Sequence, residues 1–192
     1  MTGFQEQKMK CICWDIATND YEYRYDRFTK NPLGECSSFK DKSTIYMDLL
    51  KQIKKCSPSF DTATINKVEI RTDTLDFIKT VFTNSNLSSW DQRNFLQFTK
   101  DNTILTDTQF LEPTALLQTE LQKKYAQLYD HRNRCAHNTQ SYQENLPTLK
   151  TLFDINYKYD NYFVRFAILI LIDKIFIKLY KEYLKVLEES LV

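Results

Sequence analysis

The most apolar stretch of the chain is FVRFAILILI, residues 163–172, and a helix built from it would be apolar on nearly all sides. Such a helix belongs in the centre of a protein, covered by its neighbours. The pattern then becomes amphipathic to about residue 187, and Asp160 or Asn161 can cap its start. Ten residues that include Arg165 are too short and too charged to span a bilayer. The sequence therefore predicts a long, mostly buried C-terminal helix and no membrane span.

Three further helices are predicted between residues 43 and 100, because apolar side chains recur there at helical spacing. The first begins at Ser43 and ends near Cys56, before a Ser-Pro-Ser segment that breaks the pattern. The second covers residues 65–82, and the third begins after Ser88 or Ser89. The apolar positions that define the three helices are Ile45, Leu49 and Ile53, then Val68, Leu75, Ile78 and Val81, then Trp90, Phe95 and Phe98.

Another helix is expected to begin at Pro113, because proline suits the first turn, where its missing amide proton is not needed. Its apolar stripe runs through Leu117, Leu121, Tyr125 and Leu128. The next two positions of the same row are residues 132 and 135. We expect this helix and the C-terminal helix to form the core of the protein over residues 113–190.

The first forty residues give a mixed pattern. Residues 9–16 suit a short helix, whereas Tyr21, Tyr23 and Tyr25 alternate with charged residues in the period of a half-buried strand. Residues 31–34 contain Pro and Gly and predict a turn. We therefore predict an all-α helical bundle with a long C-terminal helix and a possible short strand or irregular N-terminal segment. The whole chain, 1–192, is expected to form a single domain, with residues 1–40 as its less certain extension.

Composition excludes several classes of protein. A formal charge of +1 argues against a duplex-DNA binder with a large basic face. Two isolated glycines exclude the Gly-rich loops that cradle phosphates in P-loop kinases and dinucleotide-binding enzymes. The five cysteines are odd in number and follow no signal peptide, so we expect free thiols and a reducing cytoplasm. Cys11 and Cys13 make a poor zinc half-site, and we expect neither a metal nor a cofactor.

One segment carries a pattern of chemical side chains: YDHRNRCAHN, residues 129–138. It holds Arg132, followed directly by Asn133, and His137 five residues after the arginine. This pattern resembles the signature of HEPN-domain ribonucleases, in which an arginine and a polar residue precede a histidine by four to six positions. The resemblance covers mainly residues 113–190. It implies a HEPN-like helical bundle in which two copies of the motif meet across a homodimer interface and form a composite active site.

The chemistry of RNA cleavage suits these residue types. Attack of a ribose 2′-hydroxyl on the adjacent phosphate needs a proton acceptor, a proton donor and positive charge near the phosphorane. Histidine exchanges protons near neutral pH, and arginine offers a charged planar fork to phosphate oxygens. The resemblance therefore implies that Arg132 binds the scissile phosphate, His137 transfers protons and Asn133 holds the geometry. We expect Arg134, Lys124 and Asn138 to contact the RNA.

The resemblance also implies a biological role: a toxin or abortive-infection effector in antiviral defence, working with a possible antitoxin or defence-system partner. Two readings compete with the metal-independent endoribonuclease. In the first, the chain is a noncatalytic HEPN-like module that dimerises or binds a partner protein or nucleotide, and Arg132 and His137 are structural. In the second, it is an antitoxin or adaptor whose aromatic N-terminal segment binds a partner.

Overall fold

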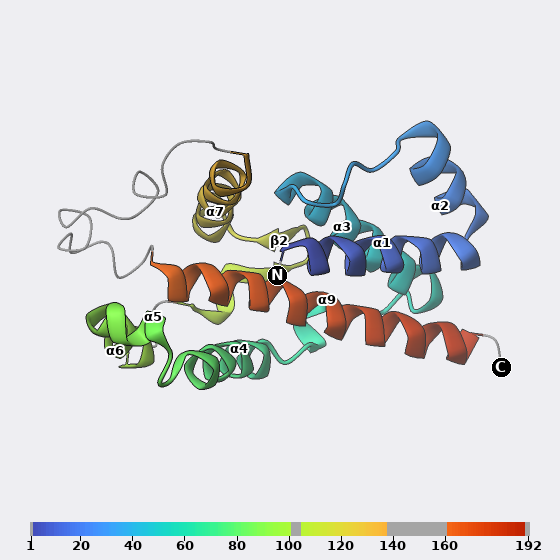
Figure 1. Cartoon of the computed structure of the whole chain (residues 1–192). Coiled ribbons are helices and arrows are strands. Elements are labelled where there is room, and N and C mark those ends of the chain that lie inside the picture. Colours follow the sequence, from blue (N-terminus) through green and yellow to red (C-terminus); the bar gives the residue numbers. More distant parts are fainter. Residues whose placement is uncertain (1, 101–104, 138–160, 191–192) are drawn as a thin grey trace. The chain divides into compact units, whose positions relative to one another are not determined.

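A computed structural model describes residues 2–100, 105–137 and 161–190, with the side chains of residues 130–137 left out (Figure 1). The contacts divide the chain into two compact units. The first unit comprises Met1–Asn66, Phe110–Gln118 and Ile172–Val192, and the second comprises Lys67–Gln109 and Thr119–Leu171. The expectation of a single domain stays a prediction.

The predicted all-α class is confirmed. The first unit contains α1 (Thr2–Asn19), α2 (Tyr21–Tyr25), the π-helical turn η1 (Asp26–Lys30), α3 (Phe39–Cys56), the short 3-10 turn η2 (Thr62–Thr64) and the strands β1 (Phe110–Glu112) and β2 (Ala115–Leu117). The second unit contains α4 (Lys67–Phe82), α5 (Asn86–Trp90), α6 (Gln92–Lys100), the 3-10 turn η3 (Asp107–Gln109) and α7 (Thr119–His137). The last helix, α9 (Tyr162–Ser190), begins in the second unit and ends in the first.

The predicted C-terminal helix is confirmed in type, position and burial. Of its two candidate caps, Asn161 is the one seen: its Oδ1 accepts a hydrogen bond from the backbone amide of Val164 at 3.1 Å. This interaction satisfies one of the free amides that every helix start presents. The following turns are buried on almost every side, as the run of apolar residues requires. Asp160, the other candidate, lies outside the described residues.

In the first unit, α1 runs parallel to the second half of α9 (Figure 1). The Lys8 ammonium donates to Asp173 at 2.8 Å, and the Tyr180 hydroxyl donates to Asp15 at 2.7 Å. Both pairs are separated by 165 residues in sequence, and this constant offset is possible only for two helices that run in the same direction. Asp173 therefore joins α9 to α1.

The helix α3 confirms its predicted apolar stripe, since Ile45, Leu49 and Ile53 are fully buried. Its Ser38 side chain caps the helix by accepting from the amide of Asp41. The Tyr46 hydroxyl, also on α3, donates to the backbone carbonyl of Glu112 at 2.5 Å. This hydrogen bond anchors the antiparallel β1–β2 ribbon, in which Phe110 pairs with Leu117 and Glu112 pairs with Ala115.

In the second unit, the start of α9 is surrounded by aromatic rings. The Phe163 ring lies 5.5 Å from Phe82 of α4 and 5.1 Å from Phe95 of α6, measured between centroids. Phe98 lies 6.2 Å from the same ring. Edge-to-face and tilted contacts at these distances are favourable beyond the area they bury. The α7 residues Leu121 and Tyr125 are also buried.

Two predictions about individual elements are wrong. The tyrosines at 21, 23 and 25 lie on the helix α2 and not on a strand, and only Tyr23 is buried. The Asp20 side chain accepts from the amide of Tyr23 and so starts a helix there. Pro113 does not begin a helix, because it lies in the turn between β1 and β2, and α7 begins at Thr119. Proline fits such a turn because its ring fixes one backbone dihedral.

The helix predicted after Ser88 or Ser89 is present but divided. Ser85 caps a short helix, α5, which ends at Trp90, and α6 starts again at Gln92. Asp91, between them, accepts from the side-chain amide of Asn94 at 2.7 Å. None of the helices in the described parts of the chain combines the length and apolarity needed to cross a membrane.

Candidate functional site

The motif residues lie on one helix. Arg132, Asn133, Arg134 and His137 all belong to α7, and His137 is the last residue of this helix that the structure describes. Lys124 lies two turns earlier on the same helix and is half-buried. Asn138, the remaining predicted RNA contact, lies outside the described residues. The backbone thus brings five of the six predicted site residues onto one continuous element.

The helical backbone fixes how the motif positions are related around the helix axis. Residues 133 and 137 are four apart, which places them about 40° from one another on adjacent turns. Residue 132 is rotated by about 140° from residue 137 and lies about 7.5 Å away along the axis. Position 132 also follows the buried Leu121 by eleven residues, so the two share nearly one angular position. Position 132 therefore lies on the same side of the helix axis as Leu121, whereas positions 133 and 137 are close together on adjacent turns.

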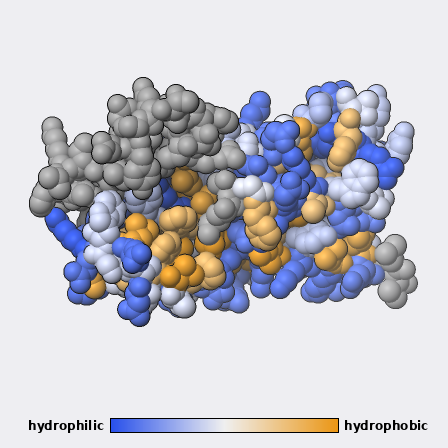
Figure 2. All heavy atoms as spheres, viewed as in Figure 1, coloured by the Kyte–Doolittle hydropathy of each residue, from blue (hydrophilic) through white to orange (hydrophobic). Residues whose placement is uncertain are grey.

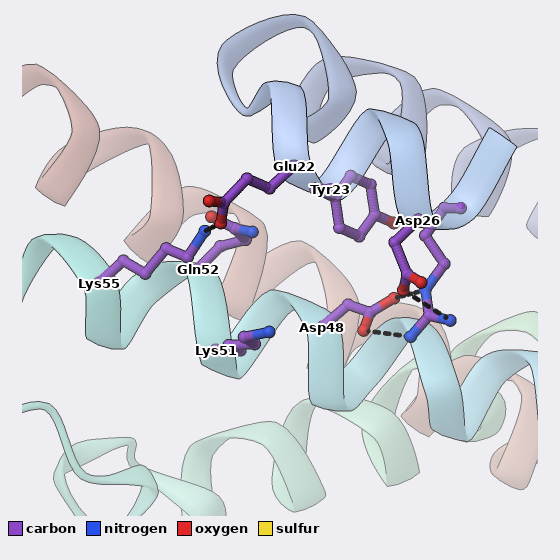
Figure 3. Close-up of a pocket in the computed structure, with 8 residues that line it drawn as sticks. Glu22, Tyr23, Asp26, Asp48, Lys51, Gln52 and Lys55 are labelled. Atoms are coloured by element: carbon purple, nitrogen blue, oxygen red, sulfur yellow. Dashed lines mark hydrogen bonds and ion pairs between the residues drawn. The ribbon is translucent and has the colours of Figure 1, made fainter. Parts of the chain in front are cut away.

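A second cluster of polar side chains lies in the first unit, between α2, η1 and α3 (Figure 3). It surrounds a cavity of about 200 Å³. The eight lining residues are Glu22, Tyr23, Asp26, Arg27, Asp48, Lys51, Gln52 and Lys55. Six of these carry a charge, three of each sign, so the lining is electrically balanced.

The strongest interaction in this cavity joins Arg27 to Asp48. The guanidinium donates through Nε and through Nη2 to the two carboxylate oxygens, each at 2.7 Å (Figure 3). A second carboxylate, that of Asp26, lies 3.4 Å from Nη1. The hydrogen bond to Asp48 raises the pKa of Arg27 above its ordinary value. The π-helical turn η1 carries this arginine.

Beside the lining residues Gln52 and Lys55, Asp20 holds α3 to the start of α2. Its Oδ2 accepts from the Gln52 side-chain amide at 2.8 Å and from the Lys55 ammonium. Burial disfavours the charged carboxylate, but the hydrogen bonds from Lys55, the Tyr23 amide and Gln52 outweigh that cost and hold the pKa of Asp20 at about 2. Asp20 is therefore a fixed anion at neutral pH.

These contacts give the cavity a structural role. General acid–base catalysis at neutral pH needs a group whose pKa lies near 7. Arg27 and Asp20 are shifted away from that range, and burial raises the pKa of the Tyr23 hydroxyl. The charged pairs instead join α2 and η1 to α3. This cluster is not predictable from the sequence, because Arg27 and Asp48 are 21 residues apart and η1 has no sequence signature.

The described residues contain no group of three or more histidine, cysteine, aspartate or glutamate side chains that could hold a metal ion. Comparisons with known proteins found no relative: no family model, no curated protein and no solved structure matches the chain. The motif on α7 therefore remains the candidate functional site, and only the residues of this chain support it.

Proposed function

We propose that this chain is a metal-independent endoribonuclease of the HEPN type, active in the cytoplasm as a toxin or antiphage defence effector. It cleaves RNA by attack of a 2′-hydroxyl on the adjacent phosphate and leaves 2′,3′-cyclic phosphate ends. The observation that supports this proposal is that Arg132, Asn133 and His137 share one helix, α7.

Each motif residue has a role that its chemistry suits. Arg132 binds the scissile phosphate, since a guanidinium stays charged and can donate two parallel hydrogen bonds. His137 transfers protons to and from the ribose and the leaving oxygen. Asn133, one turn before His137, orients the imidazole. Arg134, Lys124 and Asn138 contact the RNA backbone.

One histidine cannot be acceptor and donor in the same step. A homodimer resolves this, because a two-fold axis brings a second Arg132 and a second His137 to the same phosphate. The active species is therefore a homodimer with a composite site. An antitoxin or defence-system partner would act by covering this site or by separating the two subunits.

The test is cleavage of total RNA by the purified full chain in the presence of a metal chelator. Arg132→Ala and His137→Ala are each expected to lower the cleavage rate by about 100-fold or more, as loss of an acid–base group or of a charge-stabilising group does. His131→Ala is the matched control: it removes the chain's other histidine, beside the motif but outside it. The control should cleave at the wild-type rate.

The products provide an independent readout. Their 3′ ends should resist enzymatic extension until a phosphatase that opens cyclic phosphates is added. Cleavage that survives in both Arg132→Ala and His137→Ala, or that requires a divalent metal, would contradict the proposal. A mixture of Arg132→Ala and His137→Ala chains tests the composite site. Only if two chains share one site should the mixed dimers cleave at a rate that differs from that of either variant alone.

A second candidate function is that of a noncatalytic dimerisation module. It is favoured by an apolar groove of the first unit between α1 and α9, a cavity of about 360 Å³ whose lining includes Phe4, Ile12, Phe176 and Ile177. Figure 2 shows hydrophobic surface in this region. Phe4 and Ile177 are both exposed, so two copies related by a two-fold axis could each fill the groove of the other.

This second candidate makes a distinct prediction about oligomeric state. Ile177→Asp should produce a monomer in sedimentation analysis, and Lys178→Asp, which alters the exposed neighbour, should not. Dimers that persist in Ile177→Asp exclude the groove as the interface. RNA cleavage by the wild-type protein excludes the noncatalytic reading whatever the interface.

A further inference from the structure

The apolar groove between α1 and α9 in the first unit exposes aromatic side chains. Three rings, those of Phe4, Phe176 and Tyr180, belong to its lining, and Phe4 is 65% exposed. The two charged lining residues, Lys8 and Asp173, pair with each other at 2.8 Å. The groove, with its volume of about 360 Å³, is therefore an apolar surface without net charge of its own.

A second exposed ring extends the α1 side of the groove. Cys11 lines the groove, and Trp14 follows it by three residues, so the two lie on the same side of the helix on adjacent turns. Trp14 is 65% exposed. Its indole packs against Phe28, with 5.8 Å between the ring centroids and 77° between the ring planes. This contact orients the indole and leaves most of it open to solvent.

The α9 side of the groove carries lysines. Lys181 follows the groove residue Ile177 by four residues, which places it one turn further along and about 40° around the axis. The lysines of this part of α9 fall within about 60° of one another on that side: Lys174, Lys178, Lys181 and Lys185. Glu182 and Glu189 lie beyond them, away from Ile177, and Glu188 alone returns to the groove side in the last turn. Among the described residues, the last three of these lysines have no ion-pair partner, so the rim of the groove presents uncompensated positive charge.

An occupant that uses both features must be anionic and must carry flat apolar groups. A second copy of the chain brings the same lysines to the groove and so matches only its apolar part. Single-stranded RNA matches both features, because each base offers a face for stacking and each nucleotide carries a phosphate. Duplex RNA matches only the charge, since its bases are paired and stacked on one another.

We propose that the groove between α1 and α9 binds single-stranded RNA. The rings of Phe4 and Trp14 stack on unpaired bases, and the lysines of α9 bind the phosphates of the same strand. This inference rests on the proposed endoribonuclease, and it gives the substrate a contact in a different compact unit from the one that carries the α7 motif. It also makes unpaired regions of RNA the preferred substrate.

The test measures the dissociation constant of the full chain for a fluorescein-labelled oligoadenylate by fluorescence anisotropy. The strand has about 12 nucleotides, within the range of known single-strand sites. Each ribose carries a 2′-O-methyl group, so the strand lacks the nucleophile of the proposed cleavage, and binding is measured separately from catalysis. A strand of the same length without bases is the matched ligand, because it keeps the phosphates and removes stacking.

Phe4→Ala and Trp14→Ala should each raise the Kd for the oligoadenylate about tenfold, the effect of losing one stacked base. Neither should change the Kd for the abasic strand. Phe77→Ala is the matched control, because Phe77 is also exposed, at 44%, but lies on α4, outside the groove. In addition, Trp90→Phe leaves Trp14 as the only tryptophan, and the oligoadenylate should quench its fluorescence.

Lys181→Gln combined with Lys185→Gln should weaken the binding of both strands. The slope of log Kd against log salt concentration should fall by about 0.7 for each lysine removed, as counterion release predicts for single strands. Lys40→Gln combined with Lys54→Gln is the matched control, because both lysines are exposed on α3 and do not line the groove. Circular dichroism confirms that each variant is folded.

Equal affinity of the wild type for the two strands, or groove variants that bind the oligoadenylate as tightly as the wild type, would overturn the inference. A wild-type dimer that becomes a monomer in Ile177→Asp would also overturn it, because the groove would then hold a second copy. These results differ from those that test the nuclease. Base-dependent binding without RNA cleavage would remove the endoribonuclease and keep the groove, whereas cleavage with unaltered binding by Phe4→Ala would do the reverse.

Discussion

Breaking the Arg27–Asp48 pair should destabilise the first unit, and the size of the effect follows from its geometry. The two charges are joined by two hydrogen bonds of 2.7 Å, and their side chains are only 18% and 11% exposed. At an effective dielectric constant of about 20, the Coulomb attraction at this distance is about 6 kcal/mol. Desolvation of both groups cancels much of it. We expect a coupling energy of about 2 kcal/mol, between the values for exposed and fully buried pairs.

A double-mutant cycle measures this quantity. The free energy of unfolding in urea is determined for wild type, Arg27→Ala, Asp48→Ala and the double variant. The matched control is the Glu120–Lys123 pair of α7, which has a similar distance, 3.0 Å, but side chains that are 70% and 65% exposed. Its coupling should be about 0.3 kcal/mol, as for other exposed pairs on one helix.

Two outcomes would refute this reasoning. A coupling between Arg27 and Asp48 below about 0.5 kcal/mol would mean that burial adds nothing to the pair. Equal coupling energies in the two double-mutant cycles would lead to the same conclusion about burial. Loss of RNA cleavage in Asp48→Ala under conditions where the variant is fully folded would give the cavity a catalytic role, against the structural role assigned to it.

Two further predictions concern pH and packing. The carboxyl of Asp20 has a pKa of about 2 in the folded chain, against an ordinary value of 3.8. Its contribution to stability is therefore complete above about pH 4 and is lost as the pH falls towards 2. Asp20→Asn should flatten this part of the pH profile of the unfolding free energy, measured in urea. Phe163→Ala should cost about 3–5 kcal/mol in the same assay, because the ring is fully buried among Phe82, Phe95 and Phe98, and a cost below about 1 kcal/mol would contradict that packing.

The long elements of this fold are predictable from sequence because burial imposes a pattern on them. The α3 stripe at Ile45, Leu49 and Ile53 and the apolar start of α9 each report which side of a helix is covered. One of the two proposed caps of α9, Asn161, is also seen in the structure. These features depend on residues that are close in sequence, which is why periodicity and capping rules detect them.

Short elements escape the same rules. The five residues of α2 cover little more than one helical turn, so alternating tyrosines satisfy a strand pattern equally well. Two hydrogen bonds decide the outcome: Asp20 caps the helix, and the Arg24 side chain donates to the Ala17 carbonyl at 2.8 Å. Pro113 is compatible with a helix start and with a turn, and the pairing of β1 with β2 selects the turn.

The two candidate sites differ in what sequence can reveal about them. The motif on α7 is local: three residues within six positions define it, and their helical setting follows from the stripe at Leu121 and Tyr125. The charged cavity depends on a pairing across 21 residues and on a π-helical turn, and neither leaves a local pattern. The two sites also belong to different compact units. Substitutions on α7 that abolish cleavage should therefore leave the Arg27–Asp48 coupling energy unchanged, because sites that share no partners contribute additively. A change in that coupling upon His137→Ala would show that the sites are energetically linked, and would make the cavity part of the mechanism.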